Sequence, residues 1–364
     1  MTPTVHIDIT TLLRDPIRTG IQRVERELIR HWPAGSRLVP VAATRRGFRV
    51  LPQSMLGALI AGKPAPRFVF NHALPADRSK LRLLNPELFF DPGRAQLYRD
   101  LVGAGAGWVG WLLYDFLPWL KPQYFHTGAA MQGMSYLAAL SDIPHVAHIS
   151  AQTQQEYEQR IMHGNGRPGP VVPLGGDGLG LARQHFTPDR RRFVVLGTLE
   201  PRKNVAAILE AFAGLWQRGH PAELAIIGMA RGGTSREAEL LHRLRDDKRL
   251  HYMGAADDAT VRATLAESRA LLTASEAEGF GLAPLEALHA GIPVIATMMP
   301  SIAMLPPTGQ LRLAAPTPDA IAAAVETLWD DTTATRLWHE AATLSIKSWR
   351  SFAEEIAAWA LSDG

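Results

Sequence analysis

Short apolar runs alternate with longer amphipathic segments through the C-terminal half of the chain. Runs at residues 193–198, 223–228, 250–253, 270–273 and 293–296 have the length and composition of buried strands. Helical periodicity follows at residues 204–216, 235–245, 257–267 and 282–290. Strands that alternate with helices predict a parallel, doubly wound sheet, in which ligands bind beyond the carboxyl ends of the strands.

The N-terminal half repeats this pattern less regularly. It predicts strands at 5–9, 38–42, 68–70, 108–113 and 145–149, and helices at 21–31, 127–140 and 151–161. A segment rich in Gly and Pro, 164–180, predicts a hinge, and residues 330–360 are helical again. The fold class is therefore α/β. We expect domains at residues 1–170 and 171–345, and a C-terminal helix at 346–364 that returns to the first domain.

The absence of cysteine excludes several kinds of functional site. The 364 residues include no cysteine, which excludes disulfides, thiolate zinc sites and cysteine nucleophiles. The N-terminus lacks the pattern of a signal peptide, and the most apolar stretch, 107–120, is too short and interrupted to span a bilayer. We therefore expect a cytoplasmic protein.

Positive charge is concentrated in the first half of the chain. Residues 1–189 carry 20 Lys and Arg against 14 Asp and Glu, whereas residues 190–364 carry 18 against 21. This asymmetry indicates either an anionic partner (a phospholipid surface, a phosphorylated acceptor or nucleic acid) or solvated surface arginines. Because basic and aromatic residues are not interleaved as in nucleic-acid-binding modules, we expect no nucleic acid partner.

The sharpest candidate for chemistry is the segment 278–286, EGFGLAPLE, which follows a predicted strand and enters a predicted helix. Its glycines permit close backbone approach, and the free N–H groups at the start of a helix form a prepared anion site. Glu278 precedes the helix and Glu286 lies one turn inside it. The alternative is a glycine turn between two surface glutamates.

A second candidate, residues 197–204 with the sequence GTLEPRKN, also follows a strand and opens a helix. Arg202 and Lys203 are adjacent cations at the positive end of that helix, and a bound diphosphate would relieve their repulsion with the helix dipole. The alternative is a pair of solvated basic residues after a turn.

Together these segments resemble the family-4 retaining glycosyltransferases of the GT-B fold. The likeness is longest at 278–296, EGFGLAPLEALHAGIPVIA, and extends to IDIT at 7–10, TGIQRV at 19–24, YDFLP at 114–118 and Ile149-Ser150. It is greatest to enzymes that transfer mannose or rhamnose in bacterial O-antigen or exopolysaccharide assembly. The resemblance implies two Rossmann-like domains that face each other across a cleft, with the acceptor bound by the first and the nucleotide sugar by the second.

The resemblance also implies the reaction. A hexose would pass, with retention, from a nucleoside diphosphate sugar to a saccharide or lipid-linked acceptor, with GDP-mannose favoured over dTDP-rhamnose. Attack and departure on one face of the sugar, with the phosphate taking the acceptor's proton, would need no protein nucleophile. No Asp-x-Asp metal motif is present, and the pairs 246–247, 257–258 and 330–331 are expected to cap helices. Lys and Arg would then replace a metal ion, and no cofactor is expected.

The resemblance also implies a role for each residue that matches the family's motifs. Glu278 would contact the transferred sugar, Lys203 and Arg202 would stabilise the leaving diphosphate, and Glu286 would hold the ribose hydroxyls. The backbone N–H groups of Phe280, Gly281 and Leu282 would bind sugar hydroxyls and phosphate. Gly20 would let the first domain approach the diphosphate, and the base would be bordered by Gly228, Tyr252, Met253 and Gly254.

The chain also departs from the family pattern. Thr198 stands where the family often has Arg, and Arg202 is expected to supply that charge to the nucleotide sugar. Tyr114 stands where the family often has His, and a Pro-Glu pair common after Ser301 is absent. His145 and His148 are expected to be structural. Two other functions remain open, a sugar-nucleotide 2-epimerase and a nucleic-acid-binding protein.

A membrane surface is a further predicted partner. Arg23, Arg26 and Arg30 share one face of the helix 21–31, and tryptophans at 32, 108, 111 and 119 could accompany them at an anionic leaflet on the inner face of the cytoplasmic membrane. The alternative is that these arginines are solvated and the tryptophans lie in the core.

Overall fold

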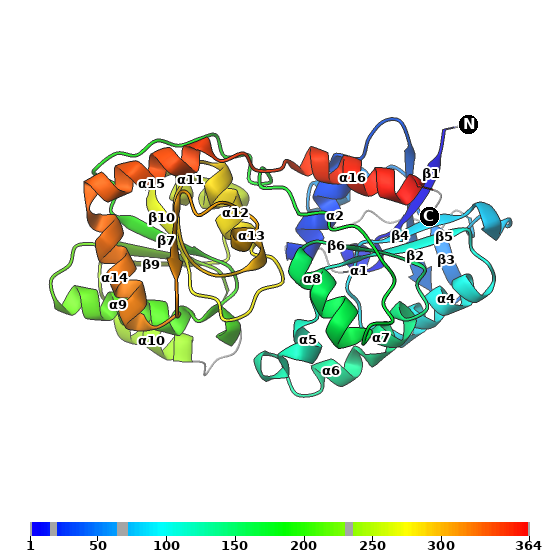
Figure 1. Ribbon diagram of the computed structural model, residues 1–364, viewed down its shortest axis with the longest axis horizontal. Coiled ribbons are helices and arrows are strands. Elements are labelled where there is room, and N and C mark those ends of the chain that lie inside the picture. The colour runs from blue at the N-terminus through cyan, green and yellow to red at the C-terminus, as the bar shows by residue number, and fades with distance from the viewer. Residues whose placement is uncertain (1, 15–19, 64–71, 230–235, 363–364) are drawn as a thin grey trace. The chain divides into compact units, whose positions relative to one another are not determined.

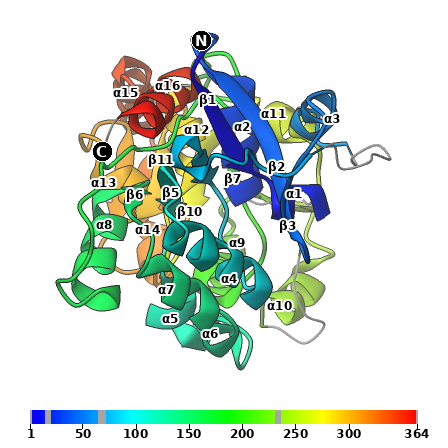
Figure 2. The same ribbon diagram turned by 90° about the vertical axis from the view of Figure 1, so that its right-hand side faces the viewer.

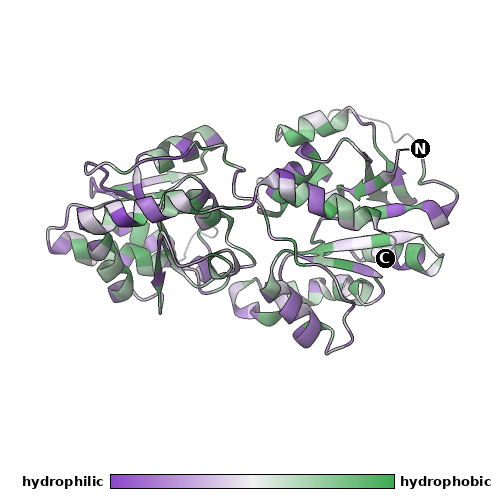
Figure 3. Cartoon of the chain, turned by 45° about the horizontal axis from the view of Figure 1, so that its top comes forward, coloured by the Kyte–Doolittle hydropathy of each residue, from purple (hydrophilic) through white to green (hydrophobic). Residues whose placement is uncertain are grey.

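The computed structural model describes residues 2–14, 20–63, 72–229 and 236–362 and divides into two compact units. Unit 1 comprises Met1–Gly175 and Lys347–Gly364, and unit 2 comprises Gly176–Ile346 (Figure 1). Each unit is a six-stranded, mostly parallel sheet flanked by helices, so the α/β class is confirmed. The helices around both sheets carry hydrophilic and hydrophobic residues side by side, as covering helices should (Figure 3).

The sheet of unit 1 has the order β3-β2-β1-β4-β5-β6 and is parallel except for the β2–β3 hairpin. Its strands are β1 (Thr4–Asp8), β2 (Arg37–Thr44), β3 (Gly47–Val50), β4 (Arg82–Asn85), β5 (Trp108–Leu113) and β6 (His145–His148). Its main helices are α1 (Thr10–Arg14), α2 (Gly20–Arg30), α3 (Met55–Ile60), α4 (Pro92–Gly103), α5 (Leu117–Leu120), α6 (Ala129–Gln132), α7 (Met134–Leu140) and α8 (Ala151–Glu156). Figure 2 shows α4 and α7 packed together beside this sheet.

The sheet of unit 2 is entirely parallel, with the order β12-β11-β10-β7-β8-β9. Its strands are β7 (Arg192–Leu196), β8 (Glu223–Ile227), β9 (Leu250–Gly254), β10 (Ser268–Thr273), β11 (Val294–Thr297) and β12 (Gln310–Leu313). Its helices are α9 (Val205–Gln217), α10 (Arg236–Leu244), α11 (Asp258–Ala266), α12 (Leu282–His289), α13 (Pro300–Ala303), α14 (Pro318–Trp329) and α15 (Asp331–Thr343). β7 and β10 are neighbours, which brings segments about 75 residues apart to one edge of the sheet.

The last helix, α16 (Trp349–Leu361), belongs to unit 1, where it packs against α2 and β4 (Figure 1). Arg82 of β4 donates to the carbonyl oxygens of Ala360 and Ser362 at 3.0 and 2.8 Å. The ring of Trp359 meets that of Trp108 edge-on. The unit boundaries fall after Gly175 and after Ile346, against predicted boundaries after residues 170 and 345.

Two predicted helices differ from the structure. The helix predicted over 127–140 is interrupted at Gly133, where any Cβ would run into the rings of Trp119 and Phe90. The helix predicted over 151–161 ends as α8 and continues as a π-helical turn, Tyr157–Ile161. The strand predicted at 68–70 lies outside the described residues. Among the described residues, no helix combines the length and apolar character needed to cross a bilayer.

Candidate active site

Three of the predicted site side chains meet at the carboxyl ends of β7 and β10. Arg202 and Lys203 lie on a 3-10 turn, Pro201–Lys203, that follows β7, and Glu278 lies on the loop that follows β10. Because these two strands are parallel neighbours, the loops after them leave the same edge of the sheet. The prediction that these residues share one site in the second domain therefore has a geometric basis in the sheet order.

Glu278 binds both cations at once. One carboxylate oxygen accepts from Arg202 Nη1 at 3.0 Å, and the other accepts from Lys203 Nζ and from the Ser275 hydroxyl, the latter at 2.8 Å. The Glu278 side chain is only 8% exposed, so these charge-assisted contacts are partly shielded from water. The arrangement fixes a guanidinium and an ammonium side by side.

The pKa of Glu278 is lowered despite its burial. Desolvation alone would raise the pKa of this carboxyl, but the charges of Lys203 and Arg202, with hydrogen bonds from Lys203 and Ser275, outweigh that effect. Glu278 is therefore ionised at neutral pH, and it partly neutralises the two cations beside it.

Arg202 also ties the two loops together. Its Nη1 donates to the carbonyl oxygen of Ala277 at 3.1 Å, and the N–H of Glu276 donates to the carbonyl oxygen of Arg202 at 2.8 Å. Its Nε pairs with Glu200 at 2.9 Å. Glu200 and Ser275 were not predicted as members of this cluster. For Ser275, the Ser-x-x-Glu spacing to Glu278 could have indicated the contact from the sequence.

The glycine loop leads directly into α12. Gly281 has φ +97°, a left-handed conformation that favours glycine, and α12 starts at the next residue, Leu282. The Phe280 side chain is buried. The N–H groups of Gly281 and Leu282 thus stand at the start of a helix, as the prediction of an anion site requires. Glu286, one turn into α12, is only 4% exposed, and its role in binding ribose stays a prediction.

The residues predicted around the nucleotide lie at the ends of β7, β8 and β9. Gly228 follows β8, and a Cβ at this position would collide with the carbonyl oxygen of Gly197, next to Thr198. The Gly228 N–H donates to the Gly254 oxygen at 2.8 Å. Tyr252, 43% exposed, and Met253 lie on β9. These residues share one edge of unit 2, and their contacts with a base stay predictions.

Gly20, the remaining predicted residue, is exposed at the start of α2 in unit 1. Residues 15–19, which precede it, lie outside the described part of the chain. The structure therefore places Gly20 at a helix terminus, and its approach to a diphosphate stays a prediction.

Unit 1 contains a buried charged network that the sequence did not reveal. Arg94 pairs with Asp8 and Glu87 at 2.7 and 2.6 Å, and Glu87 also accepts from the N–H groups of Thr11 and Leu12 at 2.9 Å. Burial raises the pKa of Glu87 and raises that of neighbouring Glu25 well above its usual range. The network therefore stabilises the turn between β1 and α1.

Two of the three acidic pairs cap helices as expected, and the two histidines pack against aromatic rings. The Asp257 carboxylate caps α11 and the Asp330 carboxylate caps α15, each accepting a backbone N–H at 2.8 Å. Asp247 pairs with Arg249 at 2.7 Å rather than capping a helix. His145 stacks on Trp108, and burial lowers the pKa of His148 to about 4. Within the described ranges, no group of three His, Asp or Glu side chains could hold a metal ion.

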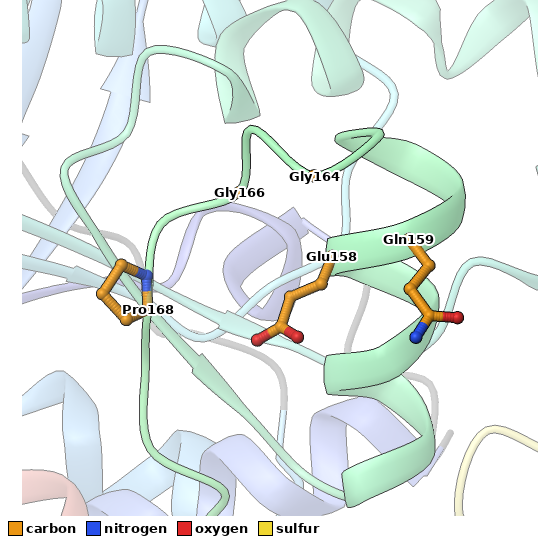
Figure 4. Close-up of a pocket in the computed structure, with 5 residues that line it drawn as sticks. All are labelled: Glu158, Gln159, Gly164, Gly166 and Pro168. Carbon is orange, nitrogen blue, oxygen red and sulfur yellow. The ribbon is translucent and has the colours of Figure 1, made fainter.

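A separate hollow of about 490 Å³ lies in unit 1, against the π-helical turn (Figure 4). Its lining consists of Glu158, Gln159, Gly164, Gly166 and Pro168. Its lining contains none of the predicted site residues and, besides Glu158, no charged residue. The cluster around Glu278 therefore stays the candidate active site.

The basic face predicted for membrane binding is wrong for one of its three arginines and two of its four tryptophans, and membrane binding itself stays a prediction. Arg26 is only 7% exposed, and its Nε donates to the carbonyl oxygen of Leu59 in α3 at 3.1 Å. Arg30 is exposed but pairs with Glu27. Trp108 and Trp111 are core residues of β5. The alternative, tryptophans in the core, is correct for these two residues.

Comparison with known proteins finds a family model that covers the cluster around Glu278. Residues 182–344 match the family model described as glycosyl transferases group 1. The serotype-specific mannosyltransferase WbdA of Escherichia coli is 27% identical over 349 residues, which cover 88% of this chain and 42% of that protein. The O-antigen chain mannosyltransferase B of Escherichia coli is 30% identical over 150 residues, 41% of this chain and 38% of that protein.

The chain thus spans less than half the length of WbdA, and its match to the mannosyltransferase B covers only part of either protein. Among solved structures, HepE from Anabaena in complex with UDP and glucose superposes with a TM-score of 0.70 at 14% identity, over 98% of this chain and 99% of that one. This likeness extends over both units and confirms the expected fold. Residues 182–344 are therefore similar to the group 1 glycosyl transferase domain, and the chain has the GT-B fold.

Proposed function

We propose that this chain transfers a hexose from a nucleoside diphosphate sugar to a saccharide or lipid-linked acceptor in the assembly of a surface polysaccharide. The observation that carries the proposal is the pairing of Arg202 and Lys203 with the buried carboxylate of Glu278, inside the group 1 domain. The cluster lies at the carboxyl ends of parallel strands, where ligands of doubly wound sheets bind. The names of the Escherichia coli relatives favour mannose, and hence GDP-mannose over dTDP-rhamnose, as the donor.

The chemistry follows from where charge develops. The bond between the sugar and the diphosphate breaks, a bond from the acceptor oxygen to the same sugar carbon forms, and the acceptor's proton passes to a phosphate oxygen. Negative charge grows on the leaving diphosphate, and Lys203 and Arg202 supply positive charge for it. Glu278 holds both cations in place. Because the cations are side chains, we propose that transfer needs no metal ion and proceeds with retention.

The test is transfer by the full chain in excess EDTA. GDP-mannose, dTDP-rhamnose and UDP-glucose are offered with mannose-containing oligosaccharide acceptors, and the released nucleoside diphosphate and the anomeric configuration of the product are measured. We expect release of GDP that depends on the acceptor, and an α-linked product. A strict need for Mg²⁺ or Mn²⁺ would contradict the assignment of Lys203 and Arg202.

The same assay separates the other candidates. A sugar-nucleotide epimerase would convert the donor without an acceptor, and a nucleic-acid-binding protein would release no nucleoside diphosphate. Contact with the inner face of the cytoplasmic membrane is part of the proposal only where the acceptor is lipid-linked. Co-sedimentation with anionic and neutral vesicles tests that contact, and binding that is lost on raising salt would support it.

A further inference from the structure

Ser301 makes two hydrogen bonds to the loop that enters α12. It lies on the short helix α13, is fully buried, and its N–H donates to the carbonyl oxygen of Phe280 at 2.9 Å. Its hydroxyl donates to the carbonyl oxygen of Gly281 at 2.7 Å. One serine therefore holds two successive peptide units of the glycine loop.

The direction of these bonds determines where the loop's donors point. A peptide unit is planar and trans, so its C=O and its N–H point in opposite directions. The carbonyls of Phe280 and Gly281 turn towards Ser301, so the N–H groups of Gly281 and Leu282 turn away from α13. These N–H groups belong to the start of α12, where the helix itself offers no acceptor.

Gly281 is required for this contact. Its φ of +97° is a left-handed conformation, and a Cβ added there would lie 2.7 Å from the Ser301 oxygen and collide with the Met299 sulfur. Only a residue without a side chain lets the hydroxyl come this close to the loop. The glycine and the serine are thus two parts of one arrangement.

α13 is itself anchored to the sheet. Arg312 of β12 donates to the carbonyl oxygens of Ile302 and Leu305 at 3.0 and 2.8 Å, at the end of α13. Thr297, at the end of β11, donates its hydroxyl to the carbonyl oxygen of Ser275 at 2.7 Å. Ser301 is therefore held in place relative to β11 and β12, and its hydrogen bonds hold the glycine loop in place relative to the same strands.

We propose that Ser301 is a positioning residue, which orients the N–H groups of Gly281 and Leu282 towards the sugar and diphosphate of the donor. The inference rests on the proposed function in that its ligand is a nucleoside diphosphate sugar. Ser301 itself touches no reacting atom, because its hydroxyl and N–H are both engaged by the loop. Its contribution is the preorganisation of donors before the ligand arrives.

Ser268 offers a matched control for Ser301. Both serines are fully buried in unit 2, and each hydroxyl donates to a backbone carbonyl at 2.7 Å, that of Leu265 for Ser268. Ser301→Ala and Ser268→Ala therefore remove the same kind of hydrogen bond, and similar losses of thermal stability are expected. A merely structural role for Ser301 predicts that the two variants bind ligand equally well.

The experiment measures GDP and UDP affinity by calorimetry, and donor KM and kcat, for the full wild-type chain and both variants. We expect Ser301→Ala to bind the preferred nucleotide about tenfold more weakly, the effect of one charge-assisted hydrogen bond, while Ser268→Ala stays within twofold of wild type. Ligand-induced protection of residues 278–286 from hydrogen exchange should fall in Ser301→Ala alone. Equal affinities and equal protection in the two variants would overturn the role of Ser301 and leave the proposed function standing. A wild-type chain that binds neither nucleotide would overturn both.

Discussion

Replacing Lys203 with methionine removes a charge from the cluster while keeping a long apolar stem. Glu278 would still have the Arg202 ion pair at 3.0 Å and the Ser275 hydrogen bond at 2.8 Å. The folded state therefore loses one contact of a lysine that is 22% exposed, without leaving a buried carboxylate unpaired. We expect a loss of unfolding free energy of about 1–2 kcal/mol.

The loss in rate should be larger than the loss in stability. Removing one preorganised group that stabilises charge in a transition state typically lowers kcat by about 10²-fold or more, or about 2.7 kcal/mol. The assay is kcat at saturating donor, with thermal unfolding of the same preparation as the control for folding. A Lys203→Met variant with kcat within about threefold of wild type would remove Lys203 from the mechanism.

Arg202 provides the companion measurement. If Arg202 replaces the cation that Thr198 does not supply, Arg202→Met should lose a similar factor in kcat. If Arg202→Met keeps full activity while Lys203→Met loses it, Lys203 acts alone. Arg202 also holds the Ala277 carbonyl at 3.1 Å, so its variant needs the same control for thermal stability.

Three other perturbations address other parts of the protein. Glu286→Gln should weaken binding of the nucleoside diphosphate about tenfold by calorimetry, because ribose hydroxyls lose a charged acceptor, and unchanged affinity would place Glu286 outside the site. Burial lowers the pKa of His148 to about 4, so below about pH 6.5 the unfolded chain binds a proton that the folded chain refuses, and stability falls as the pH drops towards 4. His148→Leu should abolish about 2.5 kcal/mol of that decline between about pH 7.5 and 4.5 in urea unfolding, whereas Leu at exposed His126 should leave it in place. Arg94→Gln should cost about 3–5 kcal/mol in unfolding free energy by leaving Asp8 and Glu87 without their cation, and an effect as small as that of Arg99→Gln, which breaks an exposed pair, would refute the role of the network.

The elements that the sequence predicted best are those buried on both faces. β7, β8 and β10 are continuous apolar runs because helices cover both sides of their sheet, and such runs are visible without knowledge of the partners. β12, with the sequence QLRL, and β3, with the sequence GFRV, lie at sheet edges and carry polar residues. They were missed because a pattern over four residues is too short to tell a strand from a loop, and the central strand β4, with the sequence RLLN, was missed for the same reason.

Some features of the site could likewise be predicted from the local sequence, whereas others depend on which strands pair. Arg202, Lys203 and Glu278 each lie just after a strand, so their place at the carboxyl edge could be predicted from the chain alone. That the two cations share a single carboxylate depends on the pairing of β7 with β10, which no local pattern contains. Ser301 reaches the loop only through the register of β11 and β12 beside β10, and it was noted in the sequence only as a departure from a family pattern.

The charge count of the first half treats every charged side chain as a surface group, which the structure shows to be wrong for several of them. Arg26 and Arg94 are both buried in unit 1, one bound to a helix carbonyl and the other between two carboxylates. A guanidinium has five donors and keeps its charge when buried, so arginine suits such internal positions better than lysine does. Charge that is paired inside the fold projects little field into solvent, but four carboxylates of the same half, Asp8, Glu25, Glu27 and Glu87, are buried as well, so burial does not remove the basic excess of this half. On the face of α2 that the helical spacing suggested, Arg26 is buried, whereas Arg30 is exposed and paired with Glu27, so the spacing alone could not tell a solvated arginine from an internal one.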